Sequence, residues 1–203
     1  MAELETLWGN MIYSDYEDAD MKEELLYTHT YPSPIGPLHL AVNKIGRVIR
    51  IGFTPLPETF TTNLRVPYRV VENKYACGEL EYQLDAYFRG ELQEFTVLPE
   101  LSGTPFQHSV WARLQKISYG ETVSYGEIAQ KIGRRQAARA VGNAVANNPV
   151  PIVVPCHRVL HRSGGIGNYA VRTLPQSDGS AMKRQLLEIE GSNVVLRSAR
   201  ASA

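Results

Sequence analysis

The sequence predicts an α+β protein with two parts: a small N-terminal α/β domain built on an antiparallel β-meander, and a C-terminal, mainly helical domain. Two observations support this fold class. Turn residues separate β-branched and aromatic runs before residue 54, a pattern typical of hairpins. Helical periodicity and helix caps dominate after residue 104. With 203 residues and 43% hydrophobic content, the chain can form the cores that two such domains need.

The chain divides at changes in composition. We expect an acidic leader over residues 1–24, an N-terminal α/β domain over 25–98, a linker over 99–103, a C-terminal domain over 104–191, and a tail over 192–203. The leader carries eight acidic residues and one lysine. No apolar run approaches the roughly 20 residues that span a bilayer, and an acidic start is not an export signal. We therefore expect no membrane association and an intracellular location, cytoplasmic or, in a eukaryote, nuclear.

Three strands and one helix are expected in the N-terminal domain. The strands cover residues 26–31, 38–42 and 48–53, separated by turn-forming stretches at 32–37 and 43–46. Residues 54–70 are rich in proline and threonine and are assigned to a loop. A helix is expected from Glu72 to Phe88, ending at Gly90.

Capping signals place three helices in the C-terminal domain. Phe106 to Ile117 is amphipathic, with Thr104 as its N-cap. A second helix begins at Ser124, where Glu127 completes a capping box, and ends at Gly133. A third covers residues 136–146. The second and third helices have the outline of a helix-turn-helix, although any helical hairpin has the same outline.

The third helix combines small side chains with one arginine. Its small residues are Ala137, Ala138, Ala140, Gly142 and Ala144, and Arg139 lies among them. One interpretation is tight helix packing with a solvated arginine. The other is a smooth helix in a DNA groove, from which Arg139 projects into the duplex.

Charge is unevenly distributed, although the net charge is zero. Residues 128–177 contain no acid and seven basic side chains: Lys131, Arg134, Arg135, Arg139, Arg158, Arg162 and Arg172. A charge block is often a solvated face, but a basic stretch around a candidate nucleophile indicates a polyanionic substrate. Nucleic acid is the leading candidate.

Cys156 lies in the run Val153–Val159, next to His157 and Arg158. Positive neighbours lower a thiol pKa and favour the nucleophilic thiolate, so we expect an activated nucleophile. The alternative is a small buried hydrophobe. Zinc would need more Cys and His ligands at closer spacing. A disulfide with Cys77 is not excluded by the count, but two cysteines are typical of intracellular proteins, and Cys77 is read as a core residue.

The chain resembles the O6-alkylguanine-DNA alkyltransferases. The resemblance covers residues 104–191 and rests on blocks in family order: Val123–Tyr125, Ala137–Gly142, Asn148–Pro151, Ile152–Val159, Gly167–Tyr169, Leu186–Leu187 and Glu190–Gly191. It implies a ribonuclease H-like N-terminal domain and a winged helix-turn-helix domain that carries the active-site cysteine. No metal or other cofactor is implied.

The resemblance also implies a role for each catalytic residue. Cys156 would accept the alkyl group, and His157 would take its proton through a bound water. Glu190 would orient the imidazole, as in a catalytic triad. Asn148 would hold the thiol loop against the recognition helix, and Tyr125 would donate a proton or hydrogen bond to the departing guanine.

Further residues would bind DNA and the extruded base. Arg139 would fill the space left by a flipped nucleotide. The surface around it would be formed by Ala137, Ala138, Gly142 and Arg135. The pocket for the base would be formed by Tyr169, Val159, Ala170 and Ser124, with the main chain at Cys156 and Val159 reading the base edge. Here the chain departs from the family, because Ala170–Arg172 replaces the usual pair of a small residue and a glycine. The stretch 173–180 is also longer than typical and is expected to be a mobile lid.

The function implied is irreversible, single-turnover transfer from O6-alkylguanine in DNA, with O4-alkylthymine as a second lesion. The partner would be double-stranded DNA with an alkylated guanine, bound by a monomer, and cooperative assembly on DNA stays open. One alternative is a cysteine hydrolase of a small ester or thioester, which would turn over. Another is a lesion-recognising DNA-binding protein without transfer, which the presence of Cys156 argues against.

Overall fold

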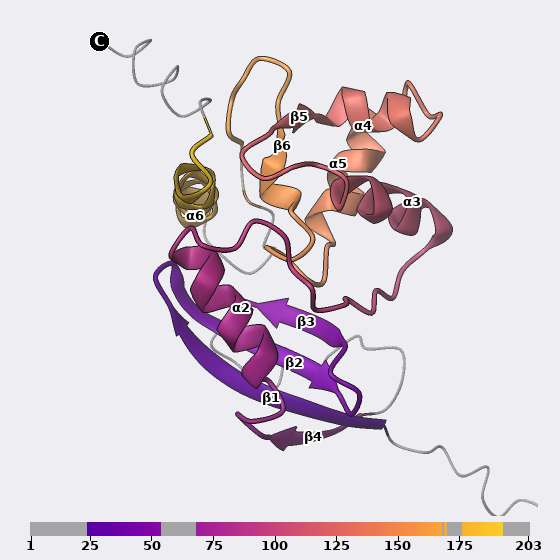
Figure 1. The fold of residues 1–203 in the computed structure, drawn as a ribbon. Coiled ribbons are helices and arrows are strands. Elements are labelled where there is room, and N and C mark those ends of the chain that lie inside the picture. The colour runs from indigo at the N-terminus through magenta and orange to yellow at the C-terminus, as the bar shows by residue number, and fades with distance from the viewer. Residues whose placement is uncertain (1–23, 54–67, 168, 170–175, 193–203) are drawn as a thin grey trace, which may run out of the picture.

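A computed structural model describes residues 24–53, 68–167, 169 and 176–192 (Figure 1). Its elements are β1 (Glu24–Ser33), β2 (Gly36–Asn43), β3 (Val48–Gly52), β4 (Tyr68–Glu72), α2 (Gly78–Phe88), α3 (Pro105–Leu114), β5 (Val123–Ser124), α4 (Tyr125–Lys131), α5 (Ala138–Ala146), the 3-10 helix η1 (Cys156–Arg158), β6 (Val159–Leu160) and α6 (Gln176–Ile189). The expected α+β class is confirmed. None of the helices within the described ranges has the length and apolar character of a membrane span.

The N-terminal half is a four-stranded sheet with the order β3-β2-β1-β4. β1 pairs with β2, and β2 with β3, both antiparallel, so the predicted meander is confirmed. Glycines make both hairpin turns possible: Gly36 has φ 104° and Gly46 has φ 78°. These left-handed conformations are open to glycine because it has no Cβ.

The fourth strand was not predicted. β4 pairs in parallel with β1, from Glu24 opposite Tyr68 to Thr28 opposite Glu72. The loop assigned to 54–70 and the helix start at Glu72 are therefore wrong over residues 68–72, and α2 begins only at Gly78. β4 is mostly exposed and lacks the alternation of a half-buried strand. It depends on pairing with a distant segment, which local propensity does not reveal. Residues 54–67 lie outside the described residues.

Helix α2 lies across one face of the sheet, with its C-terminal end directed toward α6 (Figure 1). It buries Leu80, Leu84 and Tyr87, whose spacing of three to four residues places them on one face. The same buried cluster includes Trp111 of α3 and Leu186 of α6. The sheet, α2 and the C-terminal helices therefore share a continuous core, and the end of α2 reaches the C-terminal half.

Helices α3 and α4 begin at the predicted caps, whereas α5 begins at Ala138, two residues after the predicted start at residue 136, and has no side-chain cap. The hydroxyls of Thr104 and Ser124 accept the amides of Gln107 and Glu127, and both capping boxes are complete. Helices α4 and α5 are joined through Gly133, which has φ 74°, and form the expected helix-turn-helix arrangement. Trp111 Nε1 donates to the carbonyl of Ala144 at 2.9 Å, which fixes α5 against α3.

Helix α6 begins at Gln176, so the expected lid over residues 173–180 is wrong for 176–180, which are helical. Residues 170–175 lie outside the described residues. Gly179 lies in this stretch, and glycine usually disfavours a helix interior. A Cβ at this position would lie 2.7 Å from the carbonyl oxygen of Tyr169. The glycine therefore permits close packing of α6 against the chain at Tyr169 and does not break the helix.

Candidate active site

Cys156 opens the short helix η1, directly before β6. Strand β6 pairs in parallel with β5, Val123 opposite Val159, and so joins the cysteine motif to the start of α4. In the preceding loop Ile152 has φ 74°. A β-branched residue rarely adopts this conformation, and such strain is typical of functional loops held by their surroundings. The thiol therefore sits on backbone that several neighbouring elements hold in place.

Asn148 connects the thiol to the end of α5. Its Nδ2 donates to Cys156 Sγ at 3.1 Å and to the carbonyl of Val154 at 2.8 Å. Its Oδ1 accepts the amide of Val150 at 3.1 Å. One side chain thus fixes both the loop and the sulfur relative to the helix expected to enter DNA.

Glu190, near the end of α6, lies at the centre of a buried polar network. Its Oε1 accepts a hydrogen bond from His157 Nε2 at 2.7 Å. Arg158 binds both carboxylate oxygens, Nε to Oε2 and Nη2 to Oε1, each at 2.9 Å. The amide of Gly120 donates to Oε2 at 3.3 Å. The His157 and Glu190 side chains are fully buried and in direct contact. The sequence analysis assigned both to one site, and the structure places them side by side.

The ionisation states of this network follow from its contacts. Burial alone would raise the pKa of Glu190, but hydrogen bonds from His157 and Arg158, together with the positive charge of Arg158, outweigh it and lower the pKa to about 2. Burial lowers the pKa of His157, although Glu190 opposes this. Glu190 is therefore an anion beside Arg158, and His157 is neutral. Because a carboxylate only accepts, Nε2 carries the imidazole hydrogen, and Nδ1 keeps its lone pair.

The resting thiol differs from the expectation. Burial raises the pKa of Cys156, although its hydrogen bonds with Asn148 and Tyr169 and the charge of Lys183 act in the opposite direction. The expectation that His157 and Arg158 lower this pKa is wrong, because His157 is neutral and Arg158 is bound to Glu190. The resting group is a protonated thiol. It needs a base at the moment of reaction, and Nδ1 of His157 is buried without a hydrogen-bond partner among the described residues.

Tyrosines flank the thiol. The Tyr169 hydroxyl lies 3.8 Å from Cys156 Sγ, and its ring meets Phe53 edge-on at 5.7 Å between centroids. Burial, with a smaller contribution from Cys156, raises the pKa of Tyr125, which keeps this phenol a hydrogen-bond donor at neutral pH. Ala170 lies outside the described residues.

Lys183, which the sequence analysis missed, is buried behind the motif. Its Nζ donates to the carbonyl of Val159 at 2.6 Å, and burial lowers its pKa to about 8. Val159 is fully buried, main chain and side chain alike. A lysine in an apparently amphipathic helix normally indicates a solvated face, and no local signal distinguishes Lys183 from that case.

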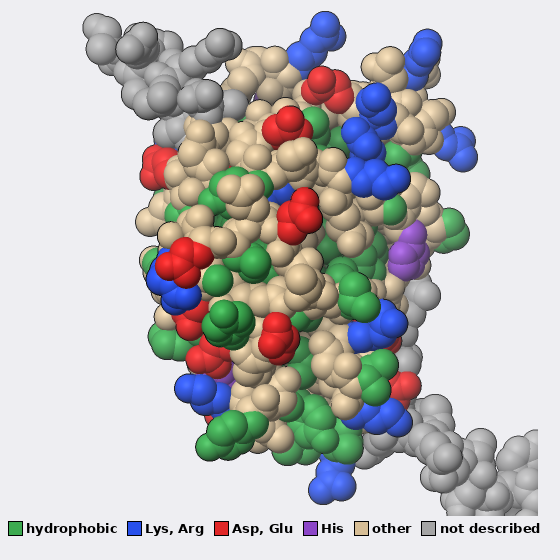
Figure 2. Space-filling model, viewed as in Figure 1, with side chains coloured by type: hydrophobic (Ala, Val, Ile, Leu, Met, Phe, Trp, Pro, Cys, Tyr) green, Lys and Arg blue, Asp and Glu red, His purple; other side chains and the backbone are tan. Residues whose placement is uncertain are grey.

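The residues expected to meet DNA lie on α5 and in the turn before it. Arg139 is exposed on α5, with Arg134 and Arg135 exposed in the turn before it. Ala137, Ala138 and Gly142 are partly exposed on the same segment. Figure 2 shows several Lys and Arg side chains projecting from the end of the molecule that carries α4.

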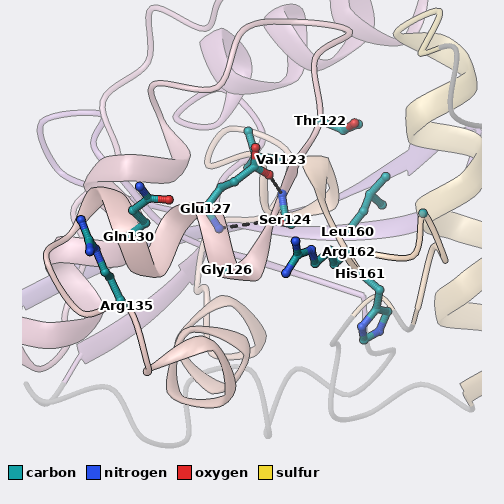
Figure 3. Close-up of a pocket in the computed structure, with 11 residues that line it drawn as sticks. Thr122, Val123, Ser124, Gly126, Glu127, Gln130, Arg135, Leu160, His161 and Arg162 are labelled. Carbon is teal, nitrogen blue, oxygen red and sulfur yellow. Dashed lines mark hydrogen bonds between the residues drawn. The ribbon is translucent and has the colours of Figure 1, made fainter.

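A surface cavity of about 800 Å³ lies between α4 and the loop after β6 (Figure 3). Arg135 and Arg162 line it, together with the acidic side chain of Glu127 and the polar residues Ser124 and Gln130. Cys156 is not among its lining residues. Ser124, predicted to line the pocket for the base, thus lines this separate cavity and caps α4 with its hydroxyl.

A buried cysteine with a neutral histidine and an ionised glutamate, beside a helix-turn-helix with exposed arginines, defines a cysteine-dependent protein that acts on DNA. Comparison with known families agrees. Residues 26–99 match the ribonuclease-like domain of 6-O-methylguanine DNA methyltransferase, and residues 105–192 match its DNA binding domain. The chain belongs to the 6-O-methylguanine DNA methyltransferase family.

Individual relatives are similar over most of their length. A methylated-DNA–protein-cysteine methyltransferase of Methanosarcina acetivorans is 42% identical over 82% of this chain and 99% of the relative. One from Mycobacterium bovis is 43% identical over 83% and 94%. The crystal structure of Mycobacterium tuberculosis O6-methylguanine methyltransferase has a TM-score of 0.67 at 41% identity, covering 81% of this chain and 92% of that one. Mycobacterium tuberculosis OGT in complex with DNA has a TM-score of 0.65 at 41% identity, covering 82% and 92%.

Proposed function

We propose that this chain repairs O6-alkylguanine in double-stranded DNA by moving the alkyl group irreversibly to Cys156. As a family member it is a methylated-DNA–protein-cysteine methyltransferase, an enzyme of direct damage reversal. The observation that carries the assignment of the acceptor is the position of Cys156 Sγ, held 3.1 Å from Asn148 Nδ2 and followed in the chain by the base His157.

In the proposed reaction, Nδ1 of His157 takes the thiol proton through a bound water. The thiolate attacks the alkyl carbon, a carbon–sulfur bond forms, and the bond from that carbon to O6 breaks. The bonding electrons leave with the guanine, whose developing charge Tyr125 stabilises by donating a hydrogen bond or a proton. Glu190 stabilises the imidazolium. The thioether has no route back, so each chain reacts once.

Two groups support the thiolate when it forms. Asn148 donates to the sulfur directly, and a hydrogen bond to an anion is stronger than one to a neutral group. The Lys183 ammonium, buried near the sulfur, favours negative charge there. These contacts suit an anion that exists only during reaction, because burial favours the neutral thiol at rest.

DNA binding would use α5 and the basic end of the molecule. Arg139 would enter the duplex and fill the space of the flipped nucleotide, while Ala137, Ala138 and Gly142 permit close approach. Arg135 and Arg162, which line the cavity in Figure 3, would each meet a phosphate of the flanking backbone from its rim.

The extruded base would lie against Tyr169, with Ala170 at the pocket wall. Because Cys156 is only 8% exposed and Tyr169 contacts it, entry of the base requires Tyr169 to move. The carbonyl of Val159, already bound by Lys183, keeps a second lone pair for the base edge.

We also propose that the chain forms two domains, residues 25–98 and 104–191, which residues 99–103 join. The leader precedes the first domain and the tail follows the second. It also includes a monomer that acts in a reducing, intracellular compartment, since Cys77 and Cys156 are both free thiols. Cooperative assembly on DNA is a separate property that binding isotherms on long duplexes would reveal.

Transfer of labelled methyl from an O6-methylguanine duplex tests this function. We expect the label on protein to reach one per chain and to stop there, with unmethylated guanine as the product. The Cys156→Ala variant should bind the duplex but take up no label. Continued turnover would indicate a hydrolase, and full labelling of the variant would remove Cys156 from the acceptor role.

A further inference from the structure

We propose that Tyr87 is a positioning residue of the alkyl-transfer site: its hydroxyl holds Glu190 and limits the pull of that carboxylate on His157. This inference rests on the proposed function, and it adds a residue of the N-terminal half to the machinery of the cysteine motif.

The geometry places Tyr87 directly on the carboxylate. Tyr87 lies in the last turn of α2 and is fully buried. Its hydroxyl donates to Glu190 Oε1 at 2.8 Å, the same oxygen that accepts His157 Nε2 at 2.7 Å. The hydroxyl oxygen is also 3.5 Å from His157 Nε2. Tyr87 therefore reaches across from the sheet domain to the pair that activates the thiol.

Packing alone does not explain the hydroxyl. The Tyr87 ring already contacts Phe95 at 5.5 Å and Tyr119 at 6.3 Å between centroids, contacts that a phenylalanine would preserve. Tyr119, in the same aromatic cluster, directs its own hydroxyl to a backbone carbonyl, that of Ile189, at 2.9 Å. Tyr119 is therefore a matched control for Tyr87, because its hydroxyl binds a backbone carbonyl whereas that of Tyr87 binds the Glu190 carboxylate.

The shared oxygen gives the hydroxyl its effect. Oε1 accepts from Tyr87, His157 Nε2 and Arg158 Nη2. Each donor draws negative charge from the oxygen. Without the hydroxyl, the charge acts more strongly on the imidazole N–H, which makes Nδ1 more basic and favours the imidazolium. Tyr87 thereby keeps His157 neutral at rest, so that Nδ1 is free to take the thiol proton.

Only one of the groups around His157 changes when the hydroxyl is removed. The titratable and charged groups that face it come from α2, η1, α6 with the residue that follows it, and the segment after β6: Tyr87, Cys156, Arg158, Lys183, Glu190 and Tyr169. A shift in the titration of His157 in a Tyr87→Phe variant therefore reports the Tyr87–Glu190 contact.

The test is an NMR titration of the His157 ring nitrogens in the full chain, compared among wild type, Tyr87→Phe and Tyr119→Phe. We expect Tyr87→Phe to raise the midpoint by about one pH unit, the order expected for a lost hydrogen bond to a charged group. Tyr119→Phe, which loses a hydroxyl but no hydrogen bond to Glu190, should leave the midpoint unchanged. Equal midpoints in wild type and Tyr87→Phe would overturn the inference, as would equal shifts in both variants.

The rate of reaction with free O6-benzylguanine gives the second readout. Its acid limb should move to higher pH in Tyr87→Phe by the same amount as the NMR midpoint. Added to Glu190→Gln, Tyr87→Phe should cause no further shift, because the shared carboxylate is gone; an undiminished further shift contradicts the mechanism. The NMR titration needs no alkyl transfer. A wild-type protein that transfers no alkyl group would therefore contradict the proposed function alone. Unchanged His157 midpoints in a protein that does transfer would contradict only the role of Tyr87.

Discussion

The buried ion pair between Arg158 and Glu190 predicts a large loss of stability when its cation is removed. Arg158 donates two hydrogen bonds of 2.9 Å to the carboxylate, and the side chains are 7% and 0% exposed. An Arg158→Met variant preserves much of the apolar stem but leaves a buried carboxylate without its main counter-charge. Breaking such a pair from one side typically costs about 3 kcal/mol or more in the free energy of unfolding.

Thermal unfolding near pH 7 measures this loss. For a chain of this size, 1 kcal/mol lowers the midpoint by roughly 2–4 °C, so we expect a decrease of about 6–12 °C. The control is Arg89→Met, whose bond to Glu91 has the same 2.9 Å length but joins side chains that are 54% and 60% exposed. It should change the midpoint little, because exposed pairs are solvated and screened. Equal decreases in both variants would refute the reasoning that burial, and not distance, sets the stability.

Three further results are expected. Because the pKa of Glu190 is lowered in the folded state, its contribution to stability is complete above the ordinary value of 4.5 and is lost as pH falls toward about 2. The thermal midpoint of Glu190→Gln should lack this dependence on acid pH, and midpoints that fall with pH in parallel in wild type and variant would contradict it. Arg139→Ala should slow repair of a duplex by about tenfold or more but spare the reaction with free O6-benzylguanine, since only the duplex needs a nucleotide flipped; equal losses argue against intercalation. The affinity for duplex DNA should fall as the salt concentration rises. Because Arg135 would meet a phosphate, Arg135→Ala should reduce the slope of log K against log salt by about one, and an unchanged slope would show that Arg135 makes no phosphate contact.

Local signals predicted much of the fold. The capping boxes at Thr104 and Ser124 involve residues three apart, and the hairpin glycines at 36 and 46 mark turns directly. What the sequence did not reveal depends on distant partners. β4 exists because it pairs with β1, and residues 176–180 are helical where Gly179 packs against Tyr169.

The candidate site shows the same division. Cys156 and His157 are adjacent in sequence, and the family resemblance supplied Asn148 and Glu190, which the structure brings into contact with them. The raised pKa of the thiol was not predicted, because neighbours in sequence say nothing of burial. Tyr87, 70 residues from His157, was likewise missed, since only the packing of α2 against the C-terminal half brings its hydroxyl to Glu190.

The most direct test of the central claim is the intact mass of the protein after incubation with excess O6-methylguanine duplex, followed by peptide mapping. We expect a gain of one methyl group per chain, located on Cys156, with no further gain at longer times. An unmodified Cys156 in the presence of excess lesion, or a methyl group on another residue, would contradict it.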